Sequence, residues 1–290
     1  MAQTPPVILS IAGFDPSSGA GITADIKTIA AHGCYGVACI TALTVQSTTG
    51  VKRVEAVSGQ TVREILAELA GDVEIAATRI GMLASGEVVD AVTDFLRSAA
   101  RPNVVFDPVL RSTSGADLLD PKAHGKVAGL LPLVSVITPN LAEAALLTGL
   151  EVRNVAEMKV AARKLHDMGA TNVIVTGGHL EKPVDVVSMA GAGGCEQTEF
   201  TSDRLKSPST HGTGCAFATA LAVQLALGRS IPDAAVLAKA YVTKGIANAY
   251  PVGKGVGPIN HLFRMQQESA PKAVVGEAAG ADPELKFHEH

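Results

Sequence analysis

The sequence predicts an α/β protein with a mostly parallel central sheet, and two features carry that prediction. Short apolar segments typical of buried strands alternate with amphipathic segments typical of helices along nearly the whole chain. Two of the buried segments are followed by a proline, Pro108 and Pro139, which ends the strand and leaves polar residues at its carboxyl end. Because open α/β sheets bind ligands at the carboxyl ends of their strands, this edge is where we expect a site.

The composition indicates one large domain with few aromatic residues. The chain has 290 residues, of which 47% are hydrophobic and 3% aromatic, enough for a core of Val, Ile, Leu and Ala. Its net charge is −4 and its 24 Lys and Arg residues are scattered, which argues against a nucleic-acid partner. The four cysteines form no C-x-x-C pair, so we expect reduced thiols without a disulfide framework or zinc site.

The two ends of the chain predict the cellular location of the protein and the boundary of its domain. The N-terminal segment has no basic region, and its apolar run is far shorter than a membrane span, so we expect a cytoplasmic protein that contacts no membrane. From about Gln266 the chain is rich in Ala, Gly, Glu and Pro without periodicity. This change predicts a domain over residues 1–265 and a flexible tail over 266–290.

The elements of the first half of the chain follow from apolar periodicity. A buried strand over Val7–Ala12 leads through a loop into a helix over Gly21–Ala31. The alternating segment Val51–Val57 predicts a half-exposed strand at an edge or in a lid. The next helices begin at serines that can cap them. The remaining expected elements are strands at Val37–Val45, Arg79–Leu83 and Val104–Asp107 and helices over 58–69 and 85–99.

The second half of the chain continues the alternation and adds a hairpin. A glycine-rich turn over 191–194 joins the strands Val184–Met189 and Cys195–Phe200. The other expected elements are strands at Val134–Thr138 and Val173–Thr176, helices beginning at Asn140, Val155 and Cys215, a helix over Pro232–Asn248 and a glycine-rich loop over 251–260.

A glycine-rich turn before a buried helix is the first candidate for an anion site. The turn His211-Gly212-Thr213-Gly214 precedes an Ala- and Leu-rich segment that starts at Cys215. A helix N-terminus has unpaired N–H groups and the positive end of the helix dipole, so glycines there let a phosphate approach. The same potential favours the thiolate of Cys215, a candidate base. The alternative is a tight start to a helix with a small buried cysteine.

Two common nucleotide-binding motifs are excluded in their usual form. Gly19-Ala20-Gly21-Ile22-Thr23-Ala24 fits G-x-G-x-x-A, but six residues separate Ala12 from Gly19 and no acidic residue ends the second strand. The chain contains no G-x-x-x-x-G-K-[ST] segment, so a P-loop is absent from the sequence. A phosphate must be held in another way.

Polar residues at the strand ends suggest how the protein could hold a phosphate. Asp107 follows one strand, and Asn140 and Glu143 share a helix face beyond another. Their oxygens can hold a hydrated Mg²⁺ that bridges nucleotide phosphates, although helix capping explains Asn140 equally well. Thr176, before Gly177-Gly178-His179, marks a further strand end. We expect these strand ends and the helix from Cys215 to converge on one face.

Several segments, in order, resemble a known family. They are Ile11–Ile22 with Ala24-Asp25, Thr41-Ala42-Leu43 with Gln46-Ser47-Thr48, Gly81-Met82-Leu83, Thr138–Ala144, Gly177-Gly178-His179 and His211–Cys215. Together they closely resemble the hydroxymethylpyrimidine and phosphomethylpyrimidine kinases of thiamine biosynthesis, which belong to the ribokinase-like superfamily. The resemblance covers about residues 7–264 and implies a three-layer α/β/α sandwich with a small β lid.

The resemblance implies a phosphotransferase that uses ATP and Mg²⁺. It would phosphorylate 4-amino-5-hydroxymethyl-2-methylpyrimidine and then convert the monophosphate to the diphosphate at the same site. Phosphoryl transfer depends on positioning and charge stabilisation, which a helix N-terminus supplies. A base matters for the first step only, since the acceptor of the second is already ionised. The resemblance also implies a homodimer.

The resemblance assigns site residues by position. It implies a pyrimidine pocket of Gly13, Asp25, Gln46, Met82 and Val109, with Asp25 and Gln46 on the amino and ring-nitrogen edge and Met82 on the ring face.

The same resemblance places the phosphate-side residues. The magnesium ligands, partly through water, would be Asp107 and Glu143; the nucleotide-binding residues would be Asn140, Thr176, Thr213 and Lys239; and the catalytic residues would be Gly212, Thr213, Gly214 and Cys215. Many family members have lysine where this chain has Thr176, so a hydroxyl stands here in place of a full charge.

Two other functions remain open from the sequence. Pyridoxal also carries a hydroxymethyl group on a flat heteroaromatic ring, so a pyridoxal or dual-specificity kinase is the nearest alternative. Gln46 and Met82 favour the pyrimidine. A non-catalytic sensor of the pyrimidine or of vitamin B6 is a remote alternative, because a binding protein has no use for a magnesium set.

Overall fold

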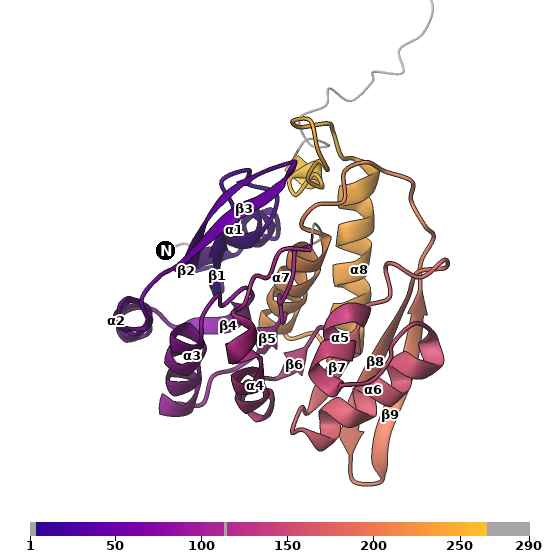
Figure 1. Ribbon diagram of the computed structural model, residues 1–290, viewed down its shortest axis with the longest axis horizontal. Helices are drawn as coiled ribbons and strands as arrows, with labels where there is room; N and C mark the ends of the chain where they lie inside the picture. Colours follow the sequence, from indigo (N-terminus) through magenta and orange to yellow (C-terminus); the bar gives the residue numbers. More distant parts are fainter. Residues whose placement is uncertain (1–3, 113–114, 266–290) are drawn as a thin grey trace, which may run out of the picture.

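A single nine-stranded sheet organises the part of the chain that the computed structural model describes, residues 4–112 and 115–265 (Figure 1). The strand order is β3-β2-β1-β4-β5-β6-β7-β8-β9. Strands β2, β1 and β4 to β7 are parallel, and β3, β8 and β9 pair antiparallel with their neighbours. The strands are β1 Val7–Phe14, β2 Tyr35–Ser47, β3 Gly50–Ala56, β4 Ile75–Ile80, β5 Val104–Phe106, β6 Val136–Ile137, β7 Asn172–Val175, β8 Val184–Gly191 and β9 Gly194–Thr201.

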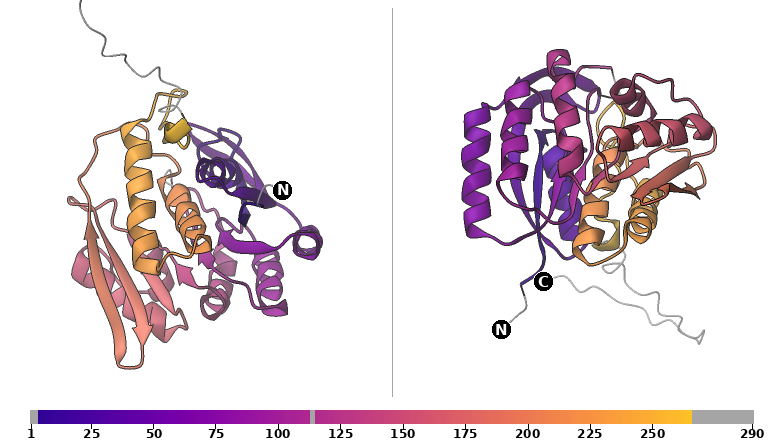
Figure 2. Two further views of the ribbon diagram at one scale, coloured as in Figure 1. Left: turned by 180° about the vertical axis from the view of Figure 1, so that it is seen from behind. Right: turned by 90° about the horizontal axis from the view of Figure 1, so that it is seen from below.

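Helices cover both faces of the sheet, as Figures 1 and 2 show. One layer contains α1 Gly21–Ala31, α7 Thr213–Ala226 and α8 Ile231–Ala247. The other contains α2 Gly59–Asp72, α3 Gly86–Ser98, α4 His124–Val127, α5 Leu141–Thr148 and α6 Val155–Asp167, with 3-10 turns at Pro121–Ala123 and Ala128–Leu133. This arrangement confirms the α/β/α sandwich, and β3 is the edge strand that the alternating segment predicts.

Side chains that alternate along the central strands fill the two layers. Ile8 and Val105 pack under α7 and α8, whereas their neighbours Leu9 and Phe106 pack in the opposite layer. All four are almost fully buried. A parallel strand covered on both faces is apolar at most of its positions, which is why these segments read as nearly continuous apolar runs.

The sequence misplaces one strand of the parallel sheet. The predicted strand Arg79–Leu83 is β4, Ile75–Ile80, so the chain leaves the sheet at Gly81. The residues that begin β4 include Ala76 and Ala77, which are weak strand formers and hide its start.

The predicted serine caps are confirmed. Ser58 accepts a hydrogen bond from the N–H of Thr61, and Ser85 accepts one from the N–H of Val88. The tail predicted over 266–290 lies outside the described residues.

Candidate active site

The predicted strand ends meet at one edge of the sheet. Strands β4, β5, β6 and β7 are parallel neighbours, so Asp107, Asn140 and Thr176 follow adjacent strands. The N–H of Thr176 donates to the carbonyl oxygen of Pro139 at 2.8 Å, which continues the ladder one step beyond β7. Three of the predicted site residues therefore lie along one edge.

The N-terminus of α7 is an open set of backbone donors. Gly212 is its N-cap residue with φ +79°, and no described side chain caps the helix. A Cβ on Gly212 would lie 1.8 Å from the carbonyl oxygen of Gly19, and a Cβ on Gly19 would lie 2.3 Å from the His211 ring. The two glycine-rich turns therefore touch, and neither contact leaves room for a side chain.

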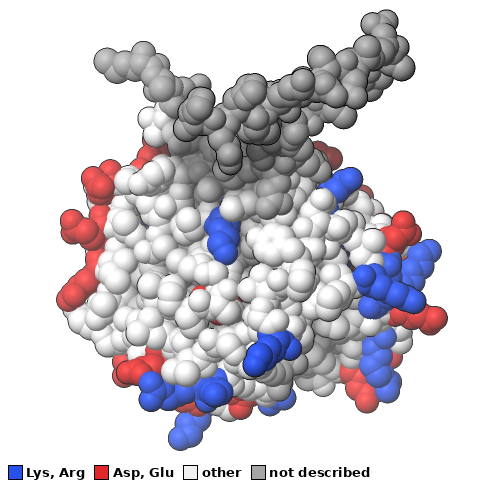
Figure 3. Space-filling view, turned by 90° about the horizontal axis from the view of Figure 1, so that it is seen from above, with Lys and Arg blue, Asp and Glu red and all other residues white. Residues whose placement is uncertain are grey.

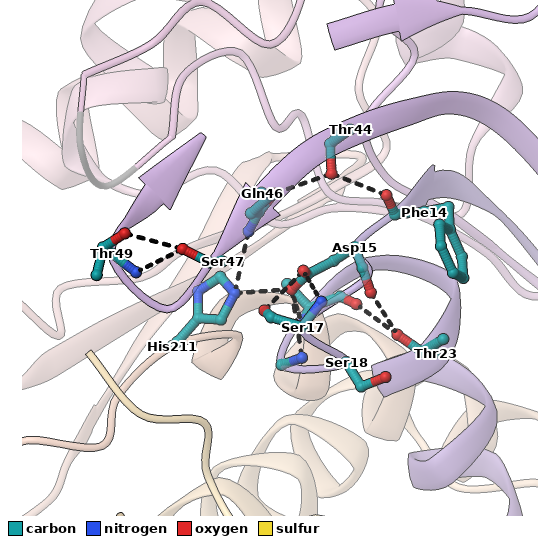
Figure 4. Close-up of polar contacts among 12 residues, drawn as sticks. Phe14, Asp15, Ser17, Ser18, Thr23, Thr44, Gln46, Ser47, Thr49 and His211 are labelled. Atoms are coloured by element: carbon teal, nitrogen blue, oxygen red, sulfur yellow. Dashed lines mark hydrogen bonds and ion pairs between the residues drawn. The ribbon is translucent and has the colours of Figure 1, made fainter. Parts of the chain in front are cut away.

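Asp15 joins these two turns, and the sequence analysis did not single it out. Its carboxylate accepts hydrogen bonds from the N–H groups of Ser17, Gly19 and Ala20 and lies 2.8 Å from Nε2 of His211 (Figure 4). The segment Asp15-Pro16-Ser17-Ser18-Gly19 has the composition of a turn in which an aspartate binds later backbone N–H groups. That signal could have identified Asp15 as the residue that shapes the turn.

A buried ion-pair chain lies beneath the site. The guanidinium of Arg79 is 3.1 Å from Asp25 and 2.6 Å from Asp107, and its side chain is fully buried. Ser10 and Thr219 each donate to Asp25 at 2.6 Å. A Cβ on Gly81 would lie 2.0 Å from Nη1 of Arg79, so the Gly81-Met82-Leu83 segment needs its glycine.

This geometry gives Asp25 protein partners that the sequence did not indicate. Asp25 is fully buried, and both of its carboxylate oxygens are hydrogen-bonded by protein groups. A ligand at the strand ends therefore does not reach the carboxylate in this structure. Asp25 holds Arg79, whereas the resemblance implied contact with a pyrimidine.

Cys215 lies on the first turn of α7 with its thiol close to Arg79. Desolvation raises the pKa of Cys215 to about 11; the Arg79 charge opposes this rise, whereas Asp107 and Asp25 add to it. The expected thiolate is therefore not the resting form at neutral pH. The helix dipole, whose influence falls off within a turn, does not compensate for burial beside two carboxylates.

Asn140 and Glu143 form a capping box at the start of α5. The Asn140 side chain accepts from the N–H of Glu143 at 3.0 Å, and the Glu143 carboxylate accepts from the N–H of Asn140 at 2.9 Å. Burial, together with the charge of Asp107, raises the pKa of Glu143 to about 8. Helix capping therefore accounts for the Asn140 side chain, while Glu143 and Asp107 are close enough to influence each other.

Lys239 reaches the end of β7 from α8. Its Nζ lies 2.7 Å from Oδ2 of Asp185, and Oδ1 of Asp185 accepts from the N–H of Gly177 at 3.0 Å. Asp185 is another residue that the sequence analysis missed, because a lone acidic residue in a strand carries no local signal. It brings a cation next to Thr176, where many family members have a lysine.

The apolar residues of the implied pocket gather under the β2–β3 hairpin. Met82 packs with Ala42, Ala84 and Leu118, and Val109 lies against this group with Val51 and Val54 of β3. A Cβ on Gly13 would lie 2.9 Å from the sulfur of Met82, so this glycine allows Met82 to lie flat against the backbone. Gln46, on β2, contacts His211 on the same side of the molecule (Figure 4).

The surface provides two further findings. Viewed from above, where the grey residues leave the face visible, Lys and Arg are interspersed with Asp and Glu and form no basic stripe (Figure 3). None of the described helices combines the length and the apolar character needed to cross a bilayer.

Comparisons with known proteins show the family of the chain. A family model described as phosphomethylpyrimidine kinase matches residues 15–260. The hydroxymethylpyrimidine/phosphomethylpyrimidine kinase of Salmonella typhimurium is 42% identical over 261 residues, which cover 88% of this chain and 96% of that protein. The thiamine biosynthesis bifunctional protein ThiED of Geobacter sulfurreducens is 40% identical over 259 residues, but this chain spans only 52% of its length.

Solved structures show the same fold. A phosphomethylpyrimidine kinase from Clostridium difficile is 34% identical with a TM-score of 0.73, covering 83% of this chain and 99% of that one. An ADP complex of Bacillus subtilis pyridoxal kinase is 32% identical with a TM-score of 0.81, covering 90% of this chain and 100% of that one. The chain therefore belongs to the phosphomethylpyrimidine kinase family, with the ribokinase-like fold.

Proposed function

We propose that the protein transfers phosphate from ATP to 4-amino-5-hydroxymethyl-2-methylpyrimidine and then to the resulting monophosphate, in thiamine diphosphate biosynthesis. The observation that carries the proposal is the position of the open N-terminus of α7. It lies against the turn at Gly19, and Cys215 in its first turn is close enough to Arg79 and Asp107 to feel their charges. The donors therefore lie near the strand end that carries Asp107, where a nucleotide and an acceptor can meet.

The N-terminus of α7 supplies the main catalytic contribution in this proposal. The backbone N–H groups of Gly212, Thr213 and Gly214 are fixed by the helix and stabilise the charge that develops on the transferred phosphoryl group. Gly13, Gln46, Met82 and Val109 hold the ring, and Asp25 acts through Arg79. Cys215 is placed to accept the hydroxymethyl proton, a role limited by its high pKa.

The donor set fits a largely hydrated Mg²⁺. Among residues 4–112 and 115–265 no group of three His, Cys, Asp or Glu side chains can enclose a metal ion. Asp107 and Glu143 nevertheless form a close acidic pair whose pKa values are both raised, chiefly by burial. A dication bound through one or two carboxylates and several waters suits such a pair, and Mg²⁺ would neutralise phosphate charge there.

The nucleotide side of the proposal rests on Lys239. Asp185 holds this lysine at the turn that follows Thr176, so it can offer a cation to the phosphates. Asn140 and Thr213 complete the proposed set through their positions at the start of α5 and α7. We assign residues 1–265 to this kinase domain, and we include a homodimer and a cytoplasmic location in the proposal.

A pyridoxal kinase is the second candidate, favoured by the likeness to pyridoxal kinase structures at TM-scores of about 0.8. Phosphoryl transfer from ATP should be measured as ADP formation with Mg-ATP and, in separate reactions, the hydroxymethylpyrimidine, its monophosphate and pyridoxal. We expect turnover with both pyrimidines. Activity with pyridoxal alone would reassign the protein to vitamin B6 salvage, and inactivity with all three would revive a non-catalytic sensor.

A further inference from the structure

The glycine-rich segment after α8 has a spacing that none of the roles proposed above uses. Its glycines recur at every second position, at 253, 255 and 257. In an extended chain alternate residues face the same side, so this spacing leaves bare backbone along one side of the segment. Bare backbone lets a neighbour approach more closely than any side chain permits. The segment is therefore suited to a close contact along that side.

The neighbour of the first two glycines is Thr48, in the turn between β2 and β3. A Cβ on Gly253 would lie 2.3 Å from the hydroxyl oxygen of Thr48, and a Cβ on Gly255 would lie 1.9 Å from its carbonyl oxygen. The N–H of Gly255 donates to that hydroxyl at 3.1 Å, and the N–H of Val256 donates to that carbonyl at 3.0 Å. The segment, yellow in Figure 1, thus lies directly against the tip of the β2–β3 hairpin.

The far end of the same segment holds the turn before α7. The N–H of His211 donates to the carbonyl oxygen of Gly257 at 3.0 Å, and the N–H of Gly257 donates to that of Pro208 at 3.2 Å. A Cβ on Gly257 would lie 2.6 Å from the hydroxyl oxygen of Ser209, so the third glycine is needed as well. His211 immediately precedes Gly212, the N-cap residue of α7. The segment therefore contacts both the hairpin and the turn that leads into the α7 donors.

The residues that follow the segment anchor it in the core. Ile259, Asn260 and His261 are almost fully buried. The N–H of Asn260 donates to the carbonyl oxygen of Gly245 on α8 at 3.0 Å, and the hydroxyl of Tyr241 donates to the carbonyl oxygen of His261 at 2.7 Å. The contact with Thr48 thus holds the hairpin against a fixed point of the molecule.

The hairpin needs a contact of this kind because it projects from the sheet. The pairing of β2 with β1 ends at Leu43, and β2 continues beyond it with β3. On the inner side, Val51 and Val54 of β3 pack against the cluster at Met82. A two-stranded ribbon by itself is at best marginally stable in water. Its position over the Met82 cluster therefore depends on what its tip contacts.

We propose that residues 253–257 form a strap that positions the β2–β3 hairpin over the ring pocket and so fixes the acceptor ring relative to the α7 donors. Thr48 is the positioning residue on the hairpin side. The inference rests on the proposed function for the identity of the ring and of the transferred group. The hold of the strap on the hairpin does not depend on that function and can be measured separately.

Two matched pairs of variants test the strap. Gly255→Ala places a Cβ 1.9 Å from the carbonyl oxygen of Thr48, whereas Gly193→Ala, in the exposed β8–β9 turn, meets no atom within 4 Å. Thr48→Val removes the hydroxyl that accepts from the N–H of Gly255 and keeps the shape of the side chain. Thr48→Ser keeps that hydroxyl.

Hydrogen exchange without substrate measures the hold on the hairpin. The protection factor of the amide at position 255 should fall about fivefold in Thr48→Val, the usual net contribution of one hydrogen bond, and at least as much in Gly255→Ala. Thr48→Ser and Gly193→Ala should match the unmodified protein. Unchanged protection in both Thr48→Val and Gly255→Ala would overturn the proposal.

Steady-state kinetics with the hydroxymethylpyrimidine measure the effect on the site. We expect KM for the pyrimidine to rise about fivefold and kcat to fall in Thr48→Val and Gly255→Ala, because the hairpin no longer fixes the ring. KM for ATP should stay within about twofold, since Asp185 on β8 holds Lys239 independently of the strap. Thr48→Ser should restore the kinetics of the unmodified protein.

The two measurements separate the possible failures. Reduced protection with unchanged KM and kcat for the pyrimidine would make the strap purely structural and overturn its positioning role. Lack of turnover of either pyrimidine by the unmodified protein would overturn the proposed function. The protection factors would then still decide whether the strap holds the hairpin.

Discussion

Nη2 of Arg79 lies 2.6 Å from Oδ2 of Asp107, and this contact ties the buried centre of the sheet to the edge that carries the site. Asp107 follows β5 and is only 5% exposed, while Arg79 is fully buried on β4. The carboxylate that faces the phosphate side is therefore held from below by a fixed cation. Removing that cation leaves two carboxylates, Asp107 and Asp25, with no counter-charge between them.

Arg79→Met should destabilise the protein by about 3–5 kcal/mol, because it removes one partner from a buried ion-pair chain. The free energy of unfolding in urea measures the effect. Arg79→Lys should cost less, since an ammonium can still reach one of the two carboxylates. A loss below about 1 kcal/mol for Arg79→Met would show that water replaces the guanidinium.

Gly212→Ala should lower the melting temperature, because position 212 has φ +79° and a Cβ there would lie 1.8 Å from the carbonyl oxygen of Gly19. Gly214→Ala is the matched control, since a Cβ on Gly214 meets no atom within 4 Å. Calorimetry on both variants should show a loss for Gly212→Ala only. Equal melting temperatures would mean that the two glycine-rich turns separate at little cost.

Cys215→Ala should slow the first phosphorylation by about a hundredfold, the usual contribution of a general base, and the second much less. The hydroxymethyl group must lose a proton, whereas the monophosphate is already ionised. Single-turnover rates for each substrate measure the difference. Equal losses in the two steps would leave Cys215 as a packing residue.

The pH profile provides an independent check of Cys215. With a pKa of about 11, the thiolate fraction rises about tenfold per pH unit through the neutral range. The rate of the first phosphorylation should therefore increase from pH 7 to pH 9, and the increase should disappear in Cys215→Ala. A flat profile in the unmodified protein would point to catalysis by the α7 donors without a base.

Thr176→Lys should lower KM for ATP several-fold, because it adds a charge to the nucleotide phosphates beside Lys239. Steady-state kinetics at varied ATP concentrations measure KM for ATP, and KM for the pyrimidine is the internal reference. An unchanged KM for ATP would indicate that Lys239, held by Asp185, already satisfies the phosphates.

The sequence predicts the parts of this molecule that local patterns encode. Strand and helix periodicity locate the layers, and Ser58 and Ser85 mark helix starts because a cap is a contact within one turn. The strand ends could be expected to converge because parallel strands share an edge. Two residues escaped prediction, Asp15 and Asp185. The turn composition after Asp15 encodes its contacts with nearby N–H groups, but no local pattern encodes its contact with His211 or that of Asp185 with Lys239.

Two expectations at the site differ from the geometry of the structure for the same reason. Asp25 resembles a ligand-binding residue by position, but its burial depends on Ser10, Arg79 and Thr219 from three other elements. The pKa of Cys215 depends on two carboxylates that only the folded sheet brings near it. A helix-dipole argument uses local geometry alone and so gives the wrong direction.

The contact between Asp15 and His211 joins residues 196 positions apart, which has a consequence for how the enzyme is made. The ribosome makes β1 and the turn at Asp15 early. Asp15 then stays without His211 until the segment before α7 has left the ribosome. Closing so long a loop carries an entropic cost that is recovered only when α7 packs on the sheet. Activity should thus appear as one of the last events of folding, and fragments that end before α7 should be inactive.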